Sequence, residues 1–406
     1  MTEPATIIPR HPHYFLDYAD AARAQLAQSF RLWGVTLWPG ADVPPALVYL
    51  AAAVVGCAVI IGVLCLTVMV LVYLERKVSG HIQSRLGPMY VGWHGVLQSI
   101  ADVFKLLAKE DLIPDNALRF LYSFAPALVL VGAFAPFAAL PFAQNLVMAN
   151  MDIGLFYIIG FASIEVIGVI MAGWASSSKW SLFGGMRLAA QMMSYELPLG
   201  LSVMTIIILA GSLNLNDIVM RQETLPYVLQ SPFGLIAFIL YYIAGLASAK
   251  RAPFDLPEAE SELVSGFHTE YSGMRFGFFF LAEYASMTLI SAVGALVFLG
   301  GWNFPFSGDG RVIVGLLQLG VKTAVLLMLM LWLRWTLPRI RIDQVMHMCF
   351  KVLLPLGMIC VLGAGIEAVS GAHAVMWALV LLLVAATYII GRKSNSFAPA
   401  RAKGHL

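Results

Sequence analysis

Three glutamates lie in parts of the sequence that are otherwise apolar. Glu165 occurs in FASIEVIGVIMAG and Glu283 in FFFLAEYASMTLI, both well inside apolar stretches, and Glu196 is predicted to begin the fourth helix, in SYELPLG. Each charge inside a bilayer costs roughly 2.5 to 3.5 kcal/mol, so we expect these carboxyl groups to be paired, hydrated or protonated. Carboxyl groups that change protonation state in a membrane are suited to passing protons. A hydrogen bond between helices, made by a neutral glutamate, is the structural alternative.

A second group of acids follows an apolar stretch, around two prolines. Four acids occur within eight residues, namely Asp255, Glu258, Glu260 and Glu262. Clustered like charges raise one another's pKa, so acids that share a pocket with the intramembrane glutamates could hold protons near neutral pH. Alternatively, Pro257 opens a helix and the acids complement the positive end of its dipole. The residues by themselves leave both explanations open.

The composition predicts the elements that must position these groups. Hydrophobic residues make up 60% of the chain, charged residues only 12%, and the mean hydropathy is +0.82, which indicates an integral membrane protein. Long apolar windows, rather than short alternating ones, exclude a β-barrel. We therefore predict an all-α, polytopic membrane helix bundle. Nine windows meet or approach the length of a spanning helix: 47–74, 120–143, 153–175, 190–211, 233–250, 276–300, 312–337, 352–369 and 374–391.

Basic residues predict the orientation of these helices, because basic loops stay on the cytoplasmic side. Nineteen of the 25 Lys and Arg residues follow helices one, three, five, seven and nine, five lie on the other side, and Lys322 lies within a span. The amino terminus is thus predicted outside, and the carboxyl terminus inside if the ninth helix spans. Lys322 and Glu367, near span ends, could reach an interface by snorkelling.

Three regions follow from this pattern. Residues 1–44 form an amino-terminal extension without an evident cleavable signal peptide, residues 45–391 the membrane domain, and residues 392–406 a basic tail. The extension contains apolar residues at helical spacing, which predicts an amphipathic helix. That helix could lie at the membrane interface or pack on a neighbouring protein. Its apolar positions are Phe15, Ala19, Ala22, Leu26, Phe30, Trp33 and Leu37.

The chain lacks the sequence patterns of a redox centre. Its four cysteines are isolated in or beside apolar stretches, and neither a Cys-x-x-Cys pair nor a Gly-rich nucleotide motif occurs. We expect the cysteines to be buried as small hydrophobic residues. No flavin, iron-sulfur cluster or metal is therefore predicted in this chain, and no nucleic-acid partner. Any electrons must come from partner proteins.

A charged segment follows the first apolar window. Within residues 71–111, Trp93, Ile100 and Phe104 belong to an apolar stripe at helical spacing, while Asp102 and Lys105 belong to a polar one. This spacing predicts a helix along the membrane surface, begun by Gly87-Pro88 and ended before Pro114. Solvation of the polar stripe is the simpler explanation for its charges.

Four long blocks resemble one family. ERKVSGHIQSRLGP with GVLQSIADVFKLLAKED resembles the first cytoplasmic loop of the H subunit of bacterial NADH:quinone oxidoreductase, respiratory complex I. GWASSSKWSLFGGMRLAAQMMSYE, KRAPFDLPEAESELVSGFHTEYSGMRFGFFFLAEY and LPRIRIDQVMHMCFKVLLPL are similar to later blocks of that family, in the same order. The resemblance covers most of the chain from residue 46 to about 369. The extension, the ninth apolar window and Cys349-Phe350, where a Trp is usual, depart from the family pattern.

The resemblance implies a chamber through which ubiquinone or menaquinone enters from the lipid. An apolar floor would accept the isoprenoid tail, furnished by Trp93, Ile100, Phe104, Phe276 and Phe278. The charged mouth would comprise Glu75, Arg76, Arg85, Asp102, Lys105, His268 and Arg275. Topological retention is the alternative explanation for Arg76, Lys77 and Arg85, and His268 could equally be an ordinary loop histidine. Arg339 and Arg341 suit partner docking or topology better than contact with quinone.

The resemblance also implies a role as a coupling subunit that is not catalytic alone. Peripheral-arm subunits with iron-sulfur clusters and the quinone headgroup site would supply the electrons. The response to quinone reduction would pass to small and antiporter-like membrane subunits. The complex would lie in the bacterial inner membrane. Quinone reduction would act through the acidic segment on the proton-relay residues, which are Glu165, Glu196, Asp255, Glu258, Glu260, Glu262 and Glu283. A membrane subunit of an energy-converting hydrogenase, a stand-alone ion-coupled transporter and a passive anchor are the alternatives.

Overall fold

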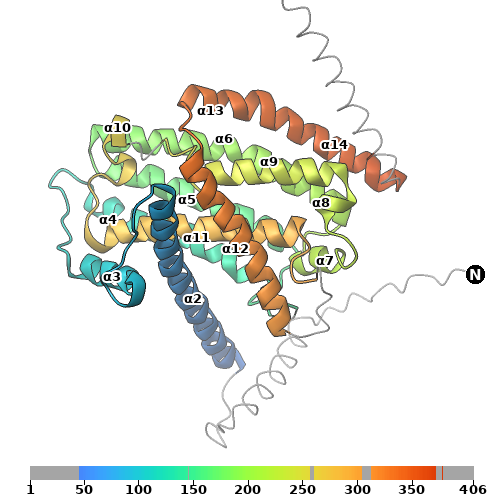
Figure 1. Cartoon of the computed structure of the whole chain (residues 1–406), viewed down its shortest axis with the longest axis horizontal. Coiled ribbons are helices and arrows are strands. Elements are labelled where there is room, and N and C mark those ends of the chain that lie inside the picture. The colour runs from blue at the N-terminus through green and yellow to red at the C-terminus, as the bar shows by residue number, and fades with distance from the viewer. Residues whose placement is uncertain (1–44, 145, 257–259, 304–311, 372–376, 378–406) are drawn as a thin grey trace, which may run out of the picture. The chain divides into compact units, whose positions relative to one another are not determined.

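The computed structural model describes residues 45–144, 146–256, 260–303, 312–371 and Trp377, with only the backbone for 45–52, 260 and 261. The described part is helical and contains no β-strand, which confirms the predicted all-α fold (Figure 1). Contacts divide the chain after Ile60, inside the first long helix, and every site below lies in the unit that begins at Ile61. The longer helices are α2 (Pro45–Ile82), α3 (Gln98–Ala108), α4 (Arg119–Phe134), α5 (Gly154–Ala175), α6 (Lys179–Ala210), α9 (Pro232–Ser248), α11 (Gly273–Phe298), α12 (Val312–Thr336), α13 (Ile342–Met348) and α14 (Leu354–Ser370).

Short helices connect these elements. They are the 3-10 turns Trp93–Gly95, Ala135–Ala139 and Gly266–His268, and the α-helices α7 (Leu215–Met220), α8 (Tyr227–Gln230) and α10 (Glu260–Leu263). A π-helical turn, Cys349–Leu353, joins α13 to α14. Within the described residues, seven helical segments are long and apolar enough to span a membrane, and α9 is a shorter apolar helix. The ninth predicted span and the predicted amino-terminal helix lie outside the described residues.

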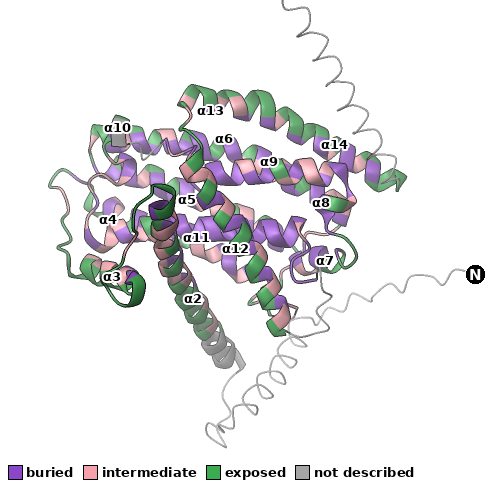
Figure 2. Ribbon diagram, viewed as in Figure 1, coloured by how far each residue is buried: buried purple, intermediate pink, exposed green. Residues whose placement is uncertain are grey.

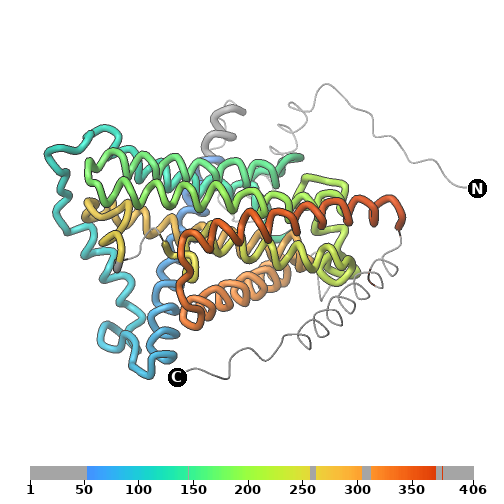
Figure 3. Tube along the Cα trace, turned by 90° about the horizontal axis from the view of Figure 1, so that it is seen from above, coloured from blue at the N-terminus to red at the C-terminus, as the bar shows by residue number. Residues whose placement is uncertain are grey.

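Helix α11 forms the centre of the bundle. It contacts α4, α6, α9 and α12, and 83% of its apolar window is buried (Figure 2). Helix α14, near the end of the sequence, packs on α6 and α9, which come from the middle of the sequence (Figure 3). Without a hydrophobic driving force between helices in lipid, such packing depends on close backbone approach at small residues. Gly132 of α4 lies directly against α5, where an added Cβ would come 2.7 Å from the backbone nitrogen of Glu165.

Two helices are longer than the apolar windows predicted. Helix α2 continues through Glu75 and Arg76 to Ile82, and α6 begins at Lys179 rather than near residue 190. The prediction that Glu196 begins a helix was therefore wrong, because Glu196 lies well inside α6. Polar residues before it, such as Gln191, are tolerated in the helix because tertiary partners accept hydrogen bonds from their donor groups. The buried Gln191 side chain donates hydrogen bonds to the carbonyls of Ala247 and Phe254, at 2.8 and 2.9 Å.

Two further predictions about isolated residues need correction. Glu367 does not snorkel to an interface, since its side chain is fully buried and accepts a 2.5 Å hydrogen bond from Ser231, the N-cap of α9. Lys322 is partly exposed and donates to the carbonyls of Leu299 and Gly301, at 2.7 and 2.6 Å, at the end of α11, so its snorkelling stays a prediction. Burial of the cysteines holds for only two of the four: Cys349 and Cys360 are buried, Cys65 is partly buried, and Cys57 is exposed.

Candidate functional site

A buried cluster of charges surrounds Glu75 in α2. The Arg251 guanidinium donates to both Glu75 carboxylate oxygens, at 3.2 and 3.3 Å, and Arg334 of α12 also pairs with Glu75. The Tyr284 hydroxyl donates to Glu75 at 2.5 Å, and the Arg251 guanidinium lies 4.2 Å from the centre of the Tyr284 ring. On its other side, Nε of Arg251 lies 2.9 Å from a carboxylate oxygen of Glu283. Arg251 therefore bridges two buried carboxylates from different helices.

A second buried pair lies beside this cluster. Nζ of Lys250 donates to Oε1 of Glu165 at 2.6 Å, and the Ser286 hydroxyl donates to Oε2 at 2.9 Å. Only 3% of the Lys250 side chain and 4% of the Glu165 side chain are exposed, so water does not screen this pair effectively. Lys250 and Arg251 are adjacent in the chain. Lys250 pairs with Glu165, whereas Arg251 pairs with Glu75 and Glu283. The two buried sites are thus joined through one turn at the end of α9.

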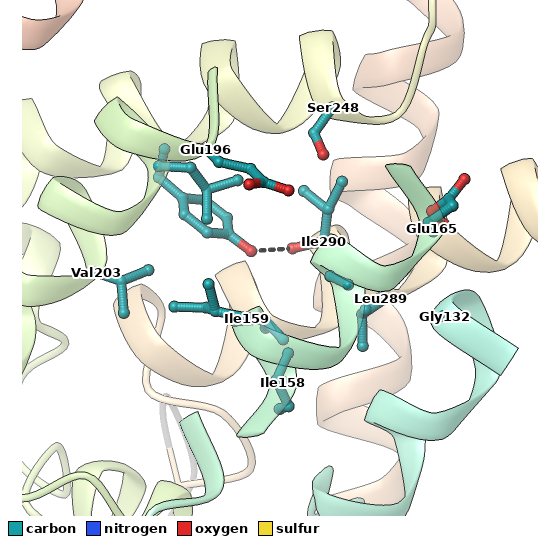
Figure 4. Close-up of a pocket in the computed structure, with 14 residues that line it drawn as sticks. Gly132, Ile158, Ile159, Glu165, Glu196, Val203, Ser248, Leu289 and Ile290 are labelled. Carbon is teal, nitrogen blue, oxygen red and sulfur yellow. Dashed lines mark hydrogen bonds between the residues drawn. The ribbon is translucent and has the colours of Figure 1, made fainter. Parts of the chain in front are cut away.

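Glu165 and Glu196 line the same cavity, which lies among α4, α5, α6, α9 and α11 (Figure 4). Its volume is about 60 Å³, enough for one or more water molecules. Ser248 and Ser286 add hydroxyl groups to a lining that is otherwise mostly apolar. Tyr241 also lines it, but its hydroxyl is already bonded to the Ile290 carbonyl at 2.8 Å. Two carboxyl groups from different helices therefore face one space that is large enough for water.

The acids after α9 are divided among separate ion pairs. Asp255 lies 3.1 Å from Arg339, and Glu262 lies 2.5 Å from Arg187 of α6. Burial raises the pKa of Asp255, although Arg339 and Arg334 oppose the rise. Neither Asp255 nor Glu262 lines the cavity. Glu258 lies outside the described residues, and only the backbone of Glu260 is described.

The first loop holds a separate, more exposed network. The Arg76 guanidinium donates to Asp102 at 2.6 Å, and Nζ of Lys105 lies 3.7 Å from Asp102. The side chains of Trp93 and Phe104 are 82% and 67% exposed, and Ile100 of the predicted apolar stripe is also exposed. Arg85 is exposed as well. The structure thus brings together three of the predicted mouth residues, whereas it places Glu75 in the buried cluster.

His268 and Arg275 lie where the acidic segment returns to α11. The His268 ring packs against Phe267 and Phe276, with ring centres 4.9 and 5.2 Å apart. Burial, and secondarily the charge of Lys250, lowers the pKa of His268 to about 4, so the imidazole is neutral at physiological pH. Arg275 lies 3.0 Å from Asp111 and thereby ties the end of the first loop to α11.

Sequence reasoning missed the basic side of the site. Lys250 and Arg251 entered it only as loop charges that set the orientation, and so did Arg334. Tyr284 and Ser286, next to Glu283 or within one helical turn of it, were not singled out. A usable sign was present, because buried carboxylates need cationic or hydrogen-bonding partners and this basic pair directly follows an apolar helix.

The fold and these charges define a polytopic membrane protein with a cluster of buried ionisable groups among its helices. The sequence model of the NADH dehydrogenase family matches residues 55–364. The H subunit of the NADH-quinone oxidoreductase of Chlorobium luteolum is 46% identical over 303 residues, which cover 71% of this chain and 81% of that protein. The H subunit of the NADH-quinone oxidoreductase of Anaeromyxobacter dehalogenans is 41% identical, over 82% of this chain and 86% of its own length. An H subunit of the Rhizobium meliloti enzyme is 44% identical, over 79% of this chain and 98% of its own length.

The chain therefore belongs to the NADH dehydrogenase family, which includes the H subunits of bacterial NADH-quinone oxidoreductases. The family resemblance inferred from the four sequence blocks is confirmed. As a member of this family the chain is one membrane subunit of a larger oxidoreductase. Within the described residues no three His, Cys, Asp or Glu side chains are grouped closely enough to hold a metal ion.

Proposed function

We propose that this chain forms much of the quinone-access chamber of an NADH:quinone oxidoreductase and couples quinone reduction to proton translocation. Electrons reach the quinone from peripheral-arm subunits that carry iron-sulfur clusters and the headgroup site. Reduction of the quinone to quinol takes up two electrons and two protons. The quinone stays neutral overall, and each nearby group that gives up a proton becomes more negative by one charge. This chain responds to that change and passes it to small and antiporter-like membrane subunits.

The observation that carries the proposal is a series of neighbouring ionisable groups, all buried except the half-buried Glu196. It starts at Glu75 and Arg251, passes through Glu283 and the Lys250 turn to Glu165, and reaches Glu196 across the cavity. Opposite charges within hydrogen-bond distance depend on one another's ionisation, so a change at one end alters the proton affinity of the next group. Asp255, held by Arg339 beside Arg334, connects the acidic segment to this series.

The first loop supports the quinone-access part of the proposal. Its exposed apolar residues, including Trp93 and Phe104, suit contact with an isoprenoid tail, and the network of Arg76, Asp102 and Lys105 suits a polar mouth. Arg85, His268 and Arg275 belong to the same proposed region. Topology is part of the proposal too: the amino terminus outside a bacterial inner membrane and the first loop inside, with a membrane domain of residues 45–391 between an extension and a basic tail.

Replacement of Glu196 by Gln in the assembled, reconstituted complex tests the relay. A missing acid slows a proton-transfer step by about 10²- to 10⁴-fold in general acid-base systems, so we expect coupled NADH:quinone turnover and pumping to fall by about tenfold or more. NADH oxidation by an artificial acceptor should remain. The matched control is Glu223→Gln, which changes an exposed glutamate in the loop after α7. Normal pumping in Glu196→Gln would remove Glu196 from the relay.

Purification in mild detergent separates the alternative functions. Copurification with flavin and iron-sulfur subunits, together with inhibitor-sensitive NADH:quinone activity, is expected here. Hydrogenase partners without quinone activity would indicate an energy-converting hydrogenase, and solute movement by the chain alone would indicate a transporter.

A further inference from the structure

The turn that ends α9 contains a residue in an unusual conformation. Lys250 has φ +58°, in the left-handed region that L side chains rarely adopt. The backbone N–H groups of Lys250 and Arg251 bond to the carbonyls of Ala247 and Leu246, both at 3.3 Å, which is the pattern of a Schellman turn. Glycine is the residue usually found at this position. A side chain kept here against that preference indicates a role for the side chain.

The turn directs its two cations to different places. The Lys250 side chain contacts Glu165, and the Arg251 side chain lies between Glu75 and Glu283. Gln191 of α6 fixes the turn from both sides, through the carbonyls of Ala247 and Phe254. Lys250 is therefore held at the boundary between the charged cluster and the cavity, and it is the basic residue of the turn that pairs with a cavity carboxylate.

The two cavity carboxyl groups have different surroundings. Glu165 accepts from both the Lys250 ammonium and the Ser286 hydroxyl, which favours its ionised form. Glu196 has the Ser163 hydroxyl as a hydrogen-bond partner, but in the part of the chain that the structure describes no basic side chain lies within ion-pair distance of it. Two carboxylates that share a small apolar cavity disfavour double ionisation. Glu196 on α6 and Tyr241 on α9 line the cavity with Glu165. Glu283 on α11 and His268 in the turn before α11 interact electrostatically with Lys250.

We propose that Lys250 is a positioning residue whose charge holds Glu165 ionised and thereby places the cavity proton on Glu196. This inference rests on the proposed relay and specifies its resting state. A charge change that draws Lys250 toward the Glu75 and Glu283 cluster would release Glu165 to accept the proton from Glu196. The proton leaves one carboxyl oxygen and binds another, so no further reactant is needed.

The test uses the complete complex with Lys250→Gly and Lys250→Asn. Both residues tolerate the left-handed conformation, so the charge is removed without backbone strain. Infrared difference spectra at neutral pH should show one additional protonated carboxyl group in each variant, and this band should disappear when Glu165→Gln is added. The profile of coupled turnover against pH should also change in both variants, because the ammonium group 2.6 Å from Glu165 has been removed. Lys250→Arg, which keeps the charge, should restore the wild-type band and profile.

Two results would separate this inference from the relay it rests on. If neither variant gains a carboxyl band that depends on Glu165, Lys250 does not control the ionisation of Glu165 and the inference is overturned. If the band forms while the pH profile stays unchanged, the charge assignment is supported and the relay through Glu165 is overturned.

Discussion

At the scale of single residues, the buried carboxylates of the site need cations to compensate their charge. Burying an isolated carboxylate is costly, yet removing one partner of a buried pair typically costs about 3 to 5 kcal/mol because the other charge remains uncompensated. Glu75, Glu165 and Glu283 each have a cation at hydrogen-bond or ion-pair distance. Such groups cannot change ionisation independently. This dependence between neighbours is the property that a coupling element needs.

Asp102 tests the quinone-access part of the proposal at the same scale. Asp102→Asn removes the charge that Arg76 and Lys105 share. Because partly exposed ion pairs contribute at most about 1 kcal/mol, we expect the KM for quinone or the sensitivity to a quinone-site inhibitor to change by up to about fivefold. Asp115→Asn, at an exposed aspartate before α4, is the control. Unchanged values for both properties would count against a role of Asp102 at the mouth.

The residue scale also separates what could be predicted from what could not. Glu165 and Glu283 were identified as buried acids because an acid within an apolar window is visible in the sequence. Their partners were not identified, since Lys250 and Arg251 are far from them in the chain and resemble ordinary topology signals. The sharing of one cavity by Glu165 and Glu196 depends on the packing of five helices, and this packing leaves no local pattern.

At the scale of elements, close helix contacts fix the distances within the site. Gly132 lets α4 approach α5 beside Glu165, and Gly168 of α5 lies against Val129 of α4 in the same contact. In the sequence the polar first half of helix α6 resembles a loop. In the fold, Arg187 pairs with Glu262 and Gln191 donates to the Phe254 carbonyl, both in the segment after α9. Apolar windows therefore predicted the presence of the helices better than their ends.

Gly132→Ala tests the packing of α4 against α5. The added Cβ would lie 2.7 Å from a backbone nitrogen, so the helices must separate, and overpacking of this kind typically costs about 1 to 3 kcal/mol. Thermal unfolding of the purified complex should therefore begin at a lower temperature. In Gly160→Ala, on α5, the added Cβ has no atom within 4 Å, and alanine favours a helix by about 0.5 to 1 kcal/mol. Equal stability of the two variants would show that the contact is not tight.

At the scale of the whole molecule, the distribution of basic residues predicts opposite sides for two loops. Gln83 follows α2, and Glu223 follows α7. In a background with the native cysteines replaced by serine, Gln83→Cys should react with a membrane-impermeant thiol reagent only in inverted vesicles. Glu223→Cys should react only in right-side-out vesicles. Labelling of both from one side would contradict the predicted topology.

The sequence by itself determined the membrane environment, the helical class, the family and the intramembrane acids. These properties depend on composition and on residues close together in the chain, because lipid admits only long apolar helices or closed barrels. Tertiary structure alone decided which cation faces which acid, where Glu196 lies in its helix, and that two acids share a cavity. Those relations join residues up to 259 positions apart, as in the pair of Glu75 and Arg334. Their energies depend on distance and burial, which the folded bundle sets.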